Sequence, residues 1–95
     1  MAEKILTHEP DAQRYTLTME GQLIALADYR VNGNLISFTH TYTQPGQRGR
    51  GYAAEVVAFA IDDVERTSNR KVVPMCWYVA DWFESNPDRT GLLTR

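Results

Sequence analysis

The sequence is short of cysteine, of long apolar runs and of excess basic charge, and each shortage excludes a class of protein. Its one cysteine, Cys76, excludes an intrachain disulfide, which fits a reducing compartment. No apolar run is long enough to span a membrane, and the N-terminus shows no signal-peptide pattern, so we expect a cytoplasmic protein with no membrane partner. A net charge of −2 argues against a nucleic-acid partner held by a basic field.

Candidate metal ligands are also scarce. Besides Cys76 there are two histidines, His8 and His40, which lie far apart in the sequence, so we expect no metal site. Hydrophobic residues make up 43% and charged residues 23%, an ordinary globular composition rather than a disordered one. The 95 residues contain no linker or internal repeat and can build one modest core. We expect a single domain over residues 1–95, as a monomer or weak dimer.

Alternation of apolar and polar residues marks three half-buried strands: residues 14–20, 23–31 and 35–43. Because only short turns separate these segments, they should form an antiparallel meander. In the third segment a period of two places His40 on the same face as Ile36, Phe38 and Tyr42. A histidine in such company is more often packed than catalytic.

The second half of the chain predicts a helix, a strand and a second helix. Residues 51–67 carry an apolar stripe at helical spacing, which indicates a helix packed on the sheet. Residues 71–76 predict a fourth strand, parallel to the third through a right-handed crossover. Pro74 has no N–H to donate, so pairing of these two strands should weaken near their C-terminal ends. A short helix over residues 78–86 ends before Pro87, which completes an α+β fold.

Two polar stretches are interpreted as facing solvent. A short apolar element around Ile5 and Leu6 precedes a turn at residues 8–11, where His8 is expected to be a solvent-facing loop residue. Asp62-Asp63 lies opposite the apolar stripe of the first helix, so it is interpreted as a solvated face rather than a catalytic carboxylate pair.

The chain is organised around residues 43–65, where a strand, a glycine-containing loop and a helix follow one another. This order is typical of a site for a phosphate-bearing ligand, because the first amides of a helix lack intrahelical partners and the helix dipole is positive there. Gly49 and Gly51 have no Cβ, so the backbone can adopt a positive φ and approach a ligand closely. Arg48 and Arg50 can add charge-assisted hydrogen bonds to phosphate oxygens.

Three other interpretations of this loop exist. Many helices begin after a glycine turn and bind no ligand. A Walker loop requires Gly-Lys-Ser/Thr, and this loop has no lysine. The dinucleotide fingerprint requires three spaced glycines and a downstream acidic residue on a second parallel strand, whereas two glycines lie directly before this helix.

The order Arg48-Gly49-Arg50-Gly51-Tyr52-Ala53 fits the pattern R/Q-x-x-G-x-G/A and resembles the acyl-CoA pyrophosphate loop of the GNAT superfamily of N-acetyltransferases. A second stretch, Lys71 to Val79, resembles the K-V-x-P-x-C-x-Y-V motif of the small single-domain GNAT-like branch. The two motifs span roughly residues 35–93 and together are more specific than either alone. The resemblance implies a GNAT-like fold that binds acetyl-CoA or coenzyme A.

The resemblance also implies roles for individual residues. In GNAT folds the two parallel strands splay apart and the pantetheine arm enters the wedge, which Pro74 would favour, although a bulge without a ligand would give the same sequence. Cys76 would lie at this wedge, either as a thiolate that carries the acyl group or as an inert core residue. The cofactor-binding residues it implies are Thr41, Tyr42, Thr43, Arg48, Gly49, Arg50, Gly51, Tyr52 and Ala53.

Two further residues are candidates for proton transfer. Tyr78 would donate a proton to the departing CoA thiolate, as a tyrosine near this point does in many GNAT enzymes, or else it is a half-buried packing residue. His40, or water, would remove a proton from the attacking amine.

Two functions follow from these residues, with a third kept for contrast. The first is an N-acetyltransferase that moves an acetyl group from acetyl-CoA to an amine, a small molecule or a protein lysine, directly or through Cys76. The second is a CoA-binding module with weak or no transferase activity, because a typical GNAT has helices after its first strand and two more C-terminal strands that help to build the acceptor side. The third is a small protein-interaction domain with a vestigial loop.

Overall fold

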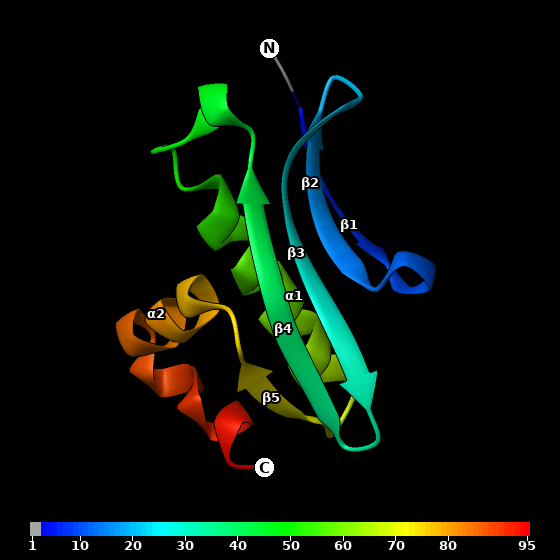
Figure 1. Ribbon diagram of the computed structural model, residues 1–95, viewed down its shortest axis with the longest axis vertical. Coiled ribbons are helices and arrows are strands. Elements are labelled where there is room, and N and C mark those ends of the chain that lie inside the picture. The colour runs from blue at the N-terminus through cyan, green and yellow to red at the C-terminus, as the bar shows by residue number, and fades with distance from the viewer. Residues whose placement is uncertain (1–2) are drawn as a thin grey trace.

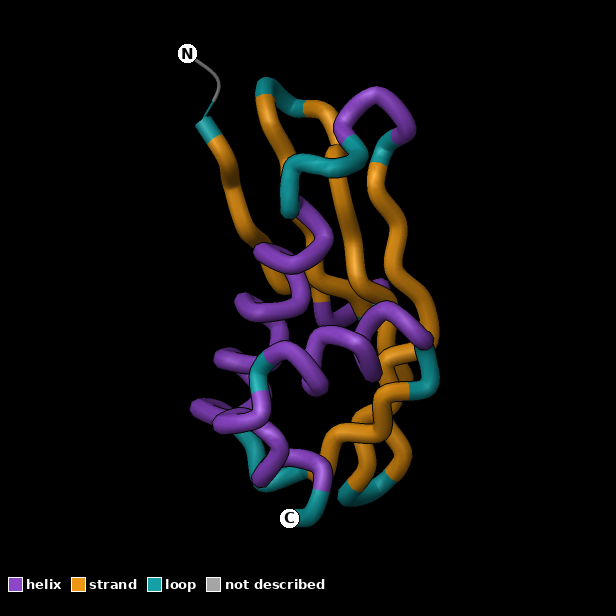
Figure 2. The backbone as a smooth tube through the Cα atoms, turned by 90° about the vertical axis from the view of Figure 1, so that its left-hand side faces the viewer, coloured by secondary structure: helices purple, strands orange, loops and turns teal. Residues whose placement is uncertain are grey.

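A mixed five-stranded sheet forms one layer, and the α-helices pack on one of its faces (Figures 1 and 2). The computed structural model describes residues 3–95. The strands lie in the order β1-β2-β3-β4-β5, antiparallel except for the parallel pair β4 and β5, which confirms the predicted α+β architecture. The strands are β1 Lys4–Glu9, β2 Arg14–Met19, β3 Gln22–Asn32, β4 Leu35–Thr43 and β5 Lys71–Pro74. The helices are α1 Tyr52–Thr67 and α2 Trp77–Ser85, with 3-10 turns η1 Pro10–Ala12, η2 Pro45–Gln47 and η3 Pro87–Leu93.

Strand β1 was not expected, and it replaces part of the turn assigned to residues 8–11. It pairs with β2 along its whole length, from Lys4 opposite Met19 to Glu9 opposite Arg14. Its apolar residues, Ile5 and Leu6, are adjacent, so the segment lacks the alternation that marks a half-buried strand. The pairing with β2 is a tertiary interaction, which overrides the local turn preference of this segment.

His8 is therefore not a solvent-facing loop residue, and that expectation is wrong. Its ring stacks on Tyr15 with centroids 4.2 Å apart and an interplanar angle of 9°. Its Nε2 atom lies 2.6 Å from the hydroxyl of Tyr29, and its Nδ1 atom lies 3.4 Å from Asp63 Oδ2. These contacts link β1 to β2, β3 and α1.

Asp63 also departs from the expected solvated helix face. Its side chain is only 16% exposed, and it accepts hydrogen bonds from the Tyr15 hydroxyl at 2.7 Å and from Arg66 at 2.9 Å. Its neighbour Asp62 is exposed and forms an ion pair with Arg89. Asp63 therefore belongs to a packed polar cluster and Asp62 does not, so the two carboxylates do not act as a pair.

The apolar stripe of α1 packs on the sheet as predicted. Its buried residues are Val56, Val57, Ala60, Ile61 and Val64. Each Val or Ile buried in this way contributes about 1.5–3 kcal/mol of transfer free energy, which holds the helix against the strands. The crossover through α1 then brings β5 alongside β4, with Leu35 opposite Lys71 and Phe38 opposite Pro74.

A β-bulge in β4 reverses the faces of its second half. Tyr29 pairs with Phe38 but Asp28 pairs with His40, so Thr39 is an extra residue. Phe38 faces the core, whereas His40 is exposed. The expected placement of His40 on the face of Ile36 and Phe38 is therefore wrong, because one inserted residue shifts the alternation.

The pairing of strands β4 and β5 ends at Pro74. Strand β5 ends there, and just beyond it the Cys76 N–H donates to the Phe38 carbonyl of β4 at 2.9 Å. Strand β4 continues to Thr43 while the chain turns away into α2 (Figure 1). Residues 39–43 consequently form a stretch of β4 with no β5 neighbour along its outer edge.

Candidate functional site

The start of α1 presents free backbone amides. Gly51 is the N-cap residue and supplies no side-chain cap, and the first helical bond runs from the Glu55 N–H to the Gly51 carbonyl at 3.1 Å. The amides of Tyr52, Ala53 and Ala54 therefore have no intrahelical acceptor. Together with the positive end of the helix dipole, they make a favourable place for an anion.

The loop that leads into α1 requires its two glycines. Gly49 has φ 81° and Gly51 has φ 80°, in the left-handed region that other residues adopt at a cost. A Cβ placed on either would meet no atom within 4 Å, so the backbone conformation rather than crowding demands glycine. The space beside both residues is left open for a ligand.

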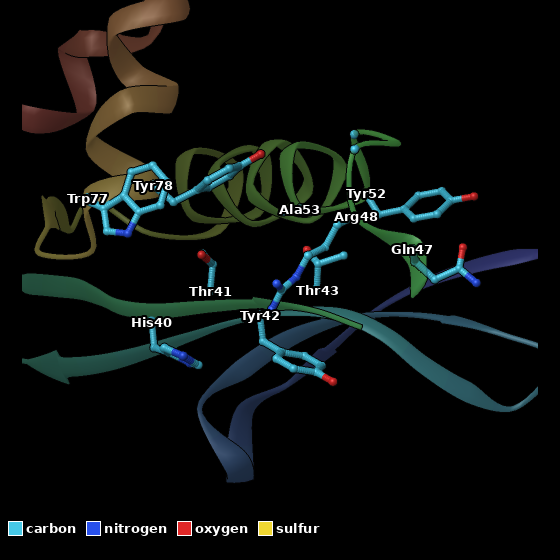
Figure 3. A pocket seen from close by; sticks show the side chains of 12 residues that line it. His40, Thr41, Tyr42, Thr43, Gln47, Arg48, Tyr52, Ala53, Trp77 and Tyr78 are labelled. Atoms are coloured by element: carbon cyan, nitrogen blue, oxygen red, sulfur yellow. The ribbon is translucent and has the colours of Figure 1, made fainter. Parts of the chain in front are cut away.

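A groove of about 520 Å³ runs from this loop to the start of α2 (Figure 3). The end of β4 forms one wall, and the first residues of α1 and α2 form the other. The residues that line it are His40, Thr41, Tyr42, Thr43, Gln47, Arg48, Gly49, Gly51, Tyr52, Ala53, Trp77 and Tyr78. The groove therefore joins the anion-binding helix start to the point where β4 and β5 separate.

Most of the residues predicted to bind the cofactor lie in this groove, on three different elements. Those that line it are Thr41, Tyr42, Thr43, Arg48, Gly49, Gly51, Tyr52 and Ala53. Arg50 is exposed in the loop and is not among the lining residues. Because of the bulge, Thr41 and Thr43 point toward the helices while Tyr42 points away from them (Figure 3).

Cys76 is partly buried and is not among the residues that line the groove. Its Sγ atom is 3.7 Å from the hydroxyl oxygen of Thr41, which does line the groove. Burial would raise the pKa of the thiol, but the Thr41 hydroxyl and the backbone N–H groups of Tyr78 and Val79 favour the thiolate, and the net effect lowers the pKa. The lowered pKa favours the thiolate, and the thiol lies beside Thr41, a residue of the groove wall.

Tyr78 lines the groove from the first turn of α2. Burial, together with the charge of Asp81, raises the pKa of its phenol, so the group stays protonated at neutral pH and can donate a proton. The ring of Trp77 stands at 74° to that of Tyr78 with centroids 5.8 Å apart, and its own side chain is largely exposed at the groove mouth. Trp77 and Gln47 also line the groove, although the sequence did not predict them there.

His40 is not brought onto the same face as Tyr78, although both line the groove. The bulge turns its side chain to the helix-free face of the sheet (Figure 3), where it is 63% exposed. There its Nδ1 atom lies 3.4 Å from Asp28 Oδ2 on β3. Asp28 was not predicted from the sequence, because the register that places it opposite His40 depends on the bulge.

A second groove, of about 500 Å³, lies between the two α-helices. It shares Gly51 and Tyr78 with the first groove, so the two meet at the start of α1. Its lining residues are Gly51, Ala54, Glu55, Ala58, Tyr78, Asp81, Trp82, Ser85 and Asn86.

Comparison with known protein families identifies the class of protein that this fold represents. A family model described as GCN5-related N-acetyl-transferase matches residues 14–92 of the 95. The chain therefore belongs to this family of GCN5-related N-acetyltransferases, and its sheet has the predicted antiparallel meander and parallel last strand, with β1 added at one edge. No curated protein matches the chain.

Two properties of the described residues bear on ligands and surroundings. No helix within residues 3–95 is long and apolar enough to cross a membrane. In the same part of the chain, no three His, Cys, Asp or Glu side chains come together in a way that could hold a metal ion.

Proposed function

We propose that the protein binds acetyl-CoA in the groove between β4 and α1 and transfers the acetyl group to a primary amine. The observation that carries this proposal is the uncapped start of α1, whose amides open into a groove that ends at Tyr78. Acetyl-CoA supplies a thioester, whose carbonyl carbon is open to attack by an amine. The residues of this chain bind, orient and exchange protons around it.

The start of the groove suits a diphosphate. The amides of Tyr52, Ala53 and Ala54 can donate to phosphate oxygens, and Arg48 adds a guanidinium from the groove wall. Arg50 is exposed beside them and can close over the phosphates from solvent. The open space around Gly49 and Gly51 lets the phosphates approach the backbone.

The other end of the groove suits the amide-containing pantetheine arm. Residues 39–43 of β4 have no β5 neighbour, so their edge can offer backbone donors and acceptors to an extended ligand. An arm lying along this edge would bring the thioester toward Tyr78. The phenol there is protonated and can donate to the departing sulfur.

Direct transfer to the amine fits the geometry better than a relay through Cys76. The thiol is partly buried and is not among the residues that line the groove, although its Sγ atom contacts the hydroxyl of Thr41. Its lowered pKa keeps the relay as the second route.

A CoA-binding module with little transferase activity is the second candidate function. It is favoured by the helix-free face of the sheet, where His40 is exposed instead of being enclosed around an acceptor. With an open acceptor side, the chain itself does little to hold an amine in place for catalysis. Binding of acetyl-CoA, by contrast, needs only the loop and the groove.

Calorimetry with two ligands tests the proposal. Acetyl-CoA should bind, and S-acetyl-N-acetylcysteamine, which keeps the thioester but lacks the diphosphate, should bind far more weakly. Mass spectrometry of spermidine and of a lysine-containing peptide, each incubated with protein and acetyl-CoA, then detects transfer. No heat with acetyl-CoA, or equal affinity for both ligands, would remove the proposal. Binding without acetylation of either amine would favour the binding module.

A further inference from the structure

We infer that Lys4, on strand β1, belongs to the phosphate site at the start of α1 and contacts a phosphate group of the cofactor. This inference rests on the proposed function. It adds to the site a cation from a strand that lies outside residues 14–92, the part of the chain that the family model matches. The observations behind it are the place of the Lys4 ammonium beside Tyr52 and its contact with Glu55.

The Lys4 ammonium stands beside the residue that begins α1. Its Nζ atom lies 5.8 Å from the centre of the Tyr52 ring. Tyr52 lines the first groove, and its backbone N–H is one of the free amides at the helix start. The ammonium and this amide therefore belong to the same end of the groove, where a ligand with more than one phosphate group can contact both.

The pairing of β1 with β2 determines the face from which Lys4 projects. His8 stacks on Tyr15 and approaches Asp63 of α1, so its side chain lies on the helix-bearing face of the sheet. Residues two apart in a strand share a face, which places Lys4 on this face as well. The contact between Lys4 and Glu55 agrees with this placement, because Glu55 lies in the first turn of α1.

Glu55 holds the ammonium at the helix start. The Lys4 Nζ atom donates a 2.7 Å hydrogen bond to Glu55 Oε1, and this bond raises the pKa of the amine, so Lys4 is charged at neutral pH. The side chain of Lys4 is 46% exposed. An ammonium group has three N–H donors, and within residues 3–95 its hydrogen bond to Glu55 uses one of them. Two donors are left for phosphate oxygens.

The carboxylate of Glu55 makes a cation necessary at this place. A negative charge in the first turn suits the helix dipole, but it repels an anion that binds to the free amides. Its Oε2 atom is buried and has no hydrogen-bond partner in the described part of the chain. Lys4 offsets this charge, so the two arginines of the loop, Arg48 and Arg50, are not opposed by an uncompensated carboxylate.

The two lysines of the chain provide a test in the native protein. Lys71, at the exposed start of β5, is the second one and serves as the internal control. NMR of isotope-labelled lysine side chains follows both residues during a titration with CoA, and the backbone amides of residues 49–54 report on the loop. CoA should shift the side-chain signals of Lys4 and leave those of Lys71 unchanged.

The outcomes of this titration separate the two proposals. Shifts at residues 49–54 with an unmoved Lys4 signal would overturn this inference and leave CoA binding intact. No shift at either place would remove the proposed function, and this inference would fall with it. Dephospho-CoA, which lacks the 3′-phosphate, identifies the group in contact. A Lys4 shift with both ligands assigns the contact to the diphosphate, and a shift with CoA alone assigns it to the 3′-phosphate.

Calorimetry with CoA measures what the contact contributes. Lys4→Met should weaken binding about 10-fold, the loss expected for one charge-assisted hydrogen bond. Lys71→Met removes the same charge far from the loop and should leave the affinity unchanged. Lys4→Arg keeps the charge and should bind within about 3-fold of the native chain. Equal affinity in Lys4→Met and Lys71→Met would overturn the inference.

A double variant distinguishes a direct contact from neutralisation of Glu55. Lys4→Met combined with Glu55→Gln removes both charges and keeps the net charge of the native chain. It should still bind CoA about 5-fold more weakly than the native chain, because the phosphate has lost its partner. Native affinity in the double variant would show that Lys4 only cancels Glu55, and would overturn the contact. Amide shifts of residues 5–9 check that β1 stays paired, and where it does not, the titration of the native chain decides.

Discussion

The hydroxyl of Tyr15 donates a 2.7 Å hydrogen bond to Asp63, which fastens β2 to the second half of α1. The tyrosine is 2% exposed, and His8 stacks on its ring from β1. Burial, with the hydrogen bond to Asp63 and the charge of that carboxylate, raises the pKa of the phenol far above its ordinary value of 10.0. The neutral phenol of Tyr15 therefore links three elements of the fold: β1, β2 and α1.

The first prediction is a loss of stability in alkaline solution. Because the pKa of Tyr15 is raised in the folded state, its contribution to stability is complete below the ordinary pKa of 10.0 and is lost as the pH rises beyond it. The free energy of unfolding, measured in urea from pH 7 to 11, should fall above about pH 10. Tyr15→Phe should flatten this fall and cost about 1–2 kcal/mol at pH 7. Tyr42→Phe, at an exposed tyrosine, should behave as the native chain, and an equal pH slope in both variants would contradict the prediction.

The second prediction concerns the backbone at the helix start. Gly51→Val should abolish binding of acetyl-CoA, because its side chain enters the path of the phosphates and a β-branched residue resists φ 80°. Calorimetry measures the affinity, and near-ultraviolet circular dichroism checks that the fold is kept. Gly46→Val is the control, since Gly46 has no positive φ and lies outside the groove. Equal affinity in the Gly51 variant and the native chain would show that the loop is purely structural.

The third prediction concerns salt. Replacing Arg48 and Arg50 together with Ala should weaken acetyl-CoA binding more at low than at high ionic strength, because these charge contacts are screened. Titrations at about 0.02 M and 0.5 M salt make the comparison. Replacing Arg66 and Lys71 with Ala removes the same charge far from the loop and should leave the affinity unchanged. A loss of affinity that is the same at both salt concentrations would argue against direct phosphate contacts.

The fourth prediction concerns the thiol. Because the net pKa of Cys76 is lowered, iodoacetamide should alkylate it with a midpoint below the ordinary thiol value of 9.0. Thr41→Val removes a donor that favours the thiolate and should move the midpoint upward, whereas Thr43→Val on the same face should not. A midpoint that does not respond to Thr41→Val would show that backbone N–H groups, rather than the Thr41 hydroxyl, lower the pKa of the thiol.

The fifth prediction separates direct transfer from a relay through Cys76. Cys76→Ala should keep acetyl-CoA affinity and most of the transfer rate, since the thiol lies outside the groove lining. Mass spectrometry after incubation with acetyl-CoA should find no stable acetyl adduct at this residue in the native chain. An adduct, together with a loss of transfer greater than about 100-fold in the variant, would support the relay.

Elements with a strong periodic pattern could be predicted from the sequence. The helix α1 and the strands β2, β3 and β4 begin and end within two residues of the predicted bounds, because each carries an apolar pattern that a sheet or helix core can bury. Strand β1 was not predicted, because its sequence has no periodic apolar pattern and its pairing with β2 is what stabilises it. The polar cluster of His8 and Asp63 was missed for the same reason.

The candidate site divides in a similar way. The glycine loop and helix start were predictable because chain order alone places amides, glycines and Arg48 together. The placement of His40 and Tyr78 on opposite faces could not be predicted, because a single bulge residue in β4 decides which face His40 takes. Asp28 could not be assigned for that reason, since only the shifted register sets it opposite His40.

The bulge at Thr39 also makes this strand sensitive to insertion and deletion. Removal of one codon there would rotate every later side chain of β4 by half a turn, so that His40 and Tyr42 would exchange sides with Thr41 and Thr43. The hydrogen-bonded frame of the sheet would survive, since such an irregularity is local to two strands. A scaffold built in this way can gain or lose its chemistry in one genetic step while its architecture stays the same.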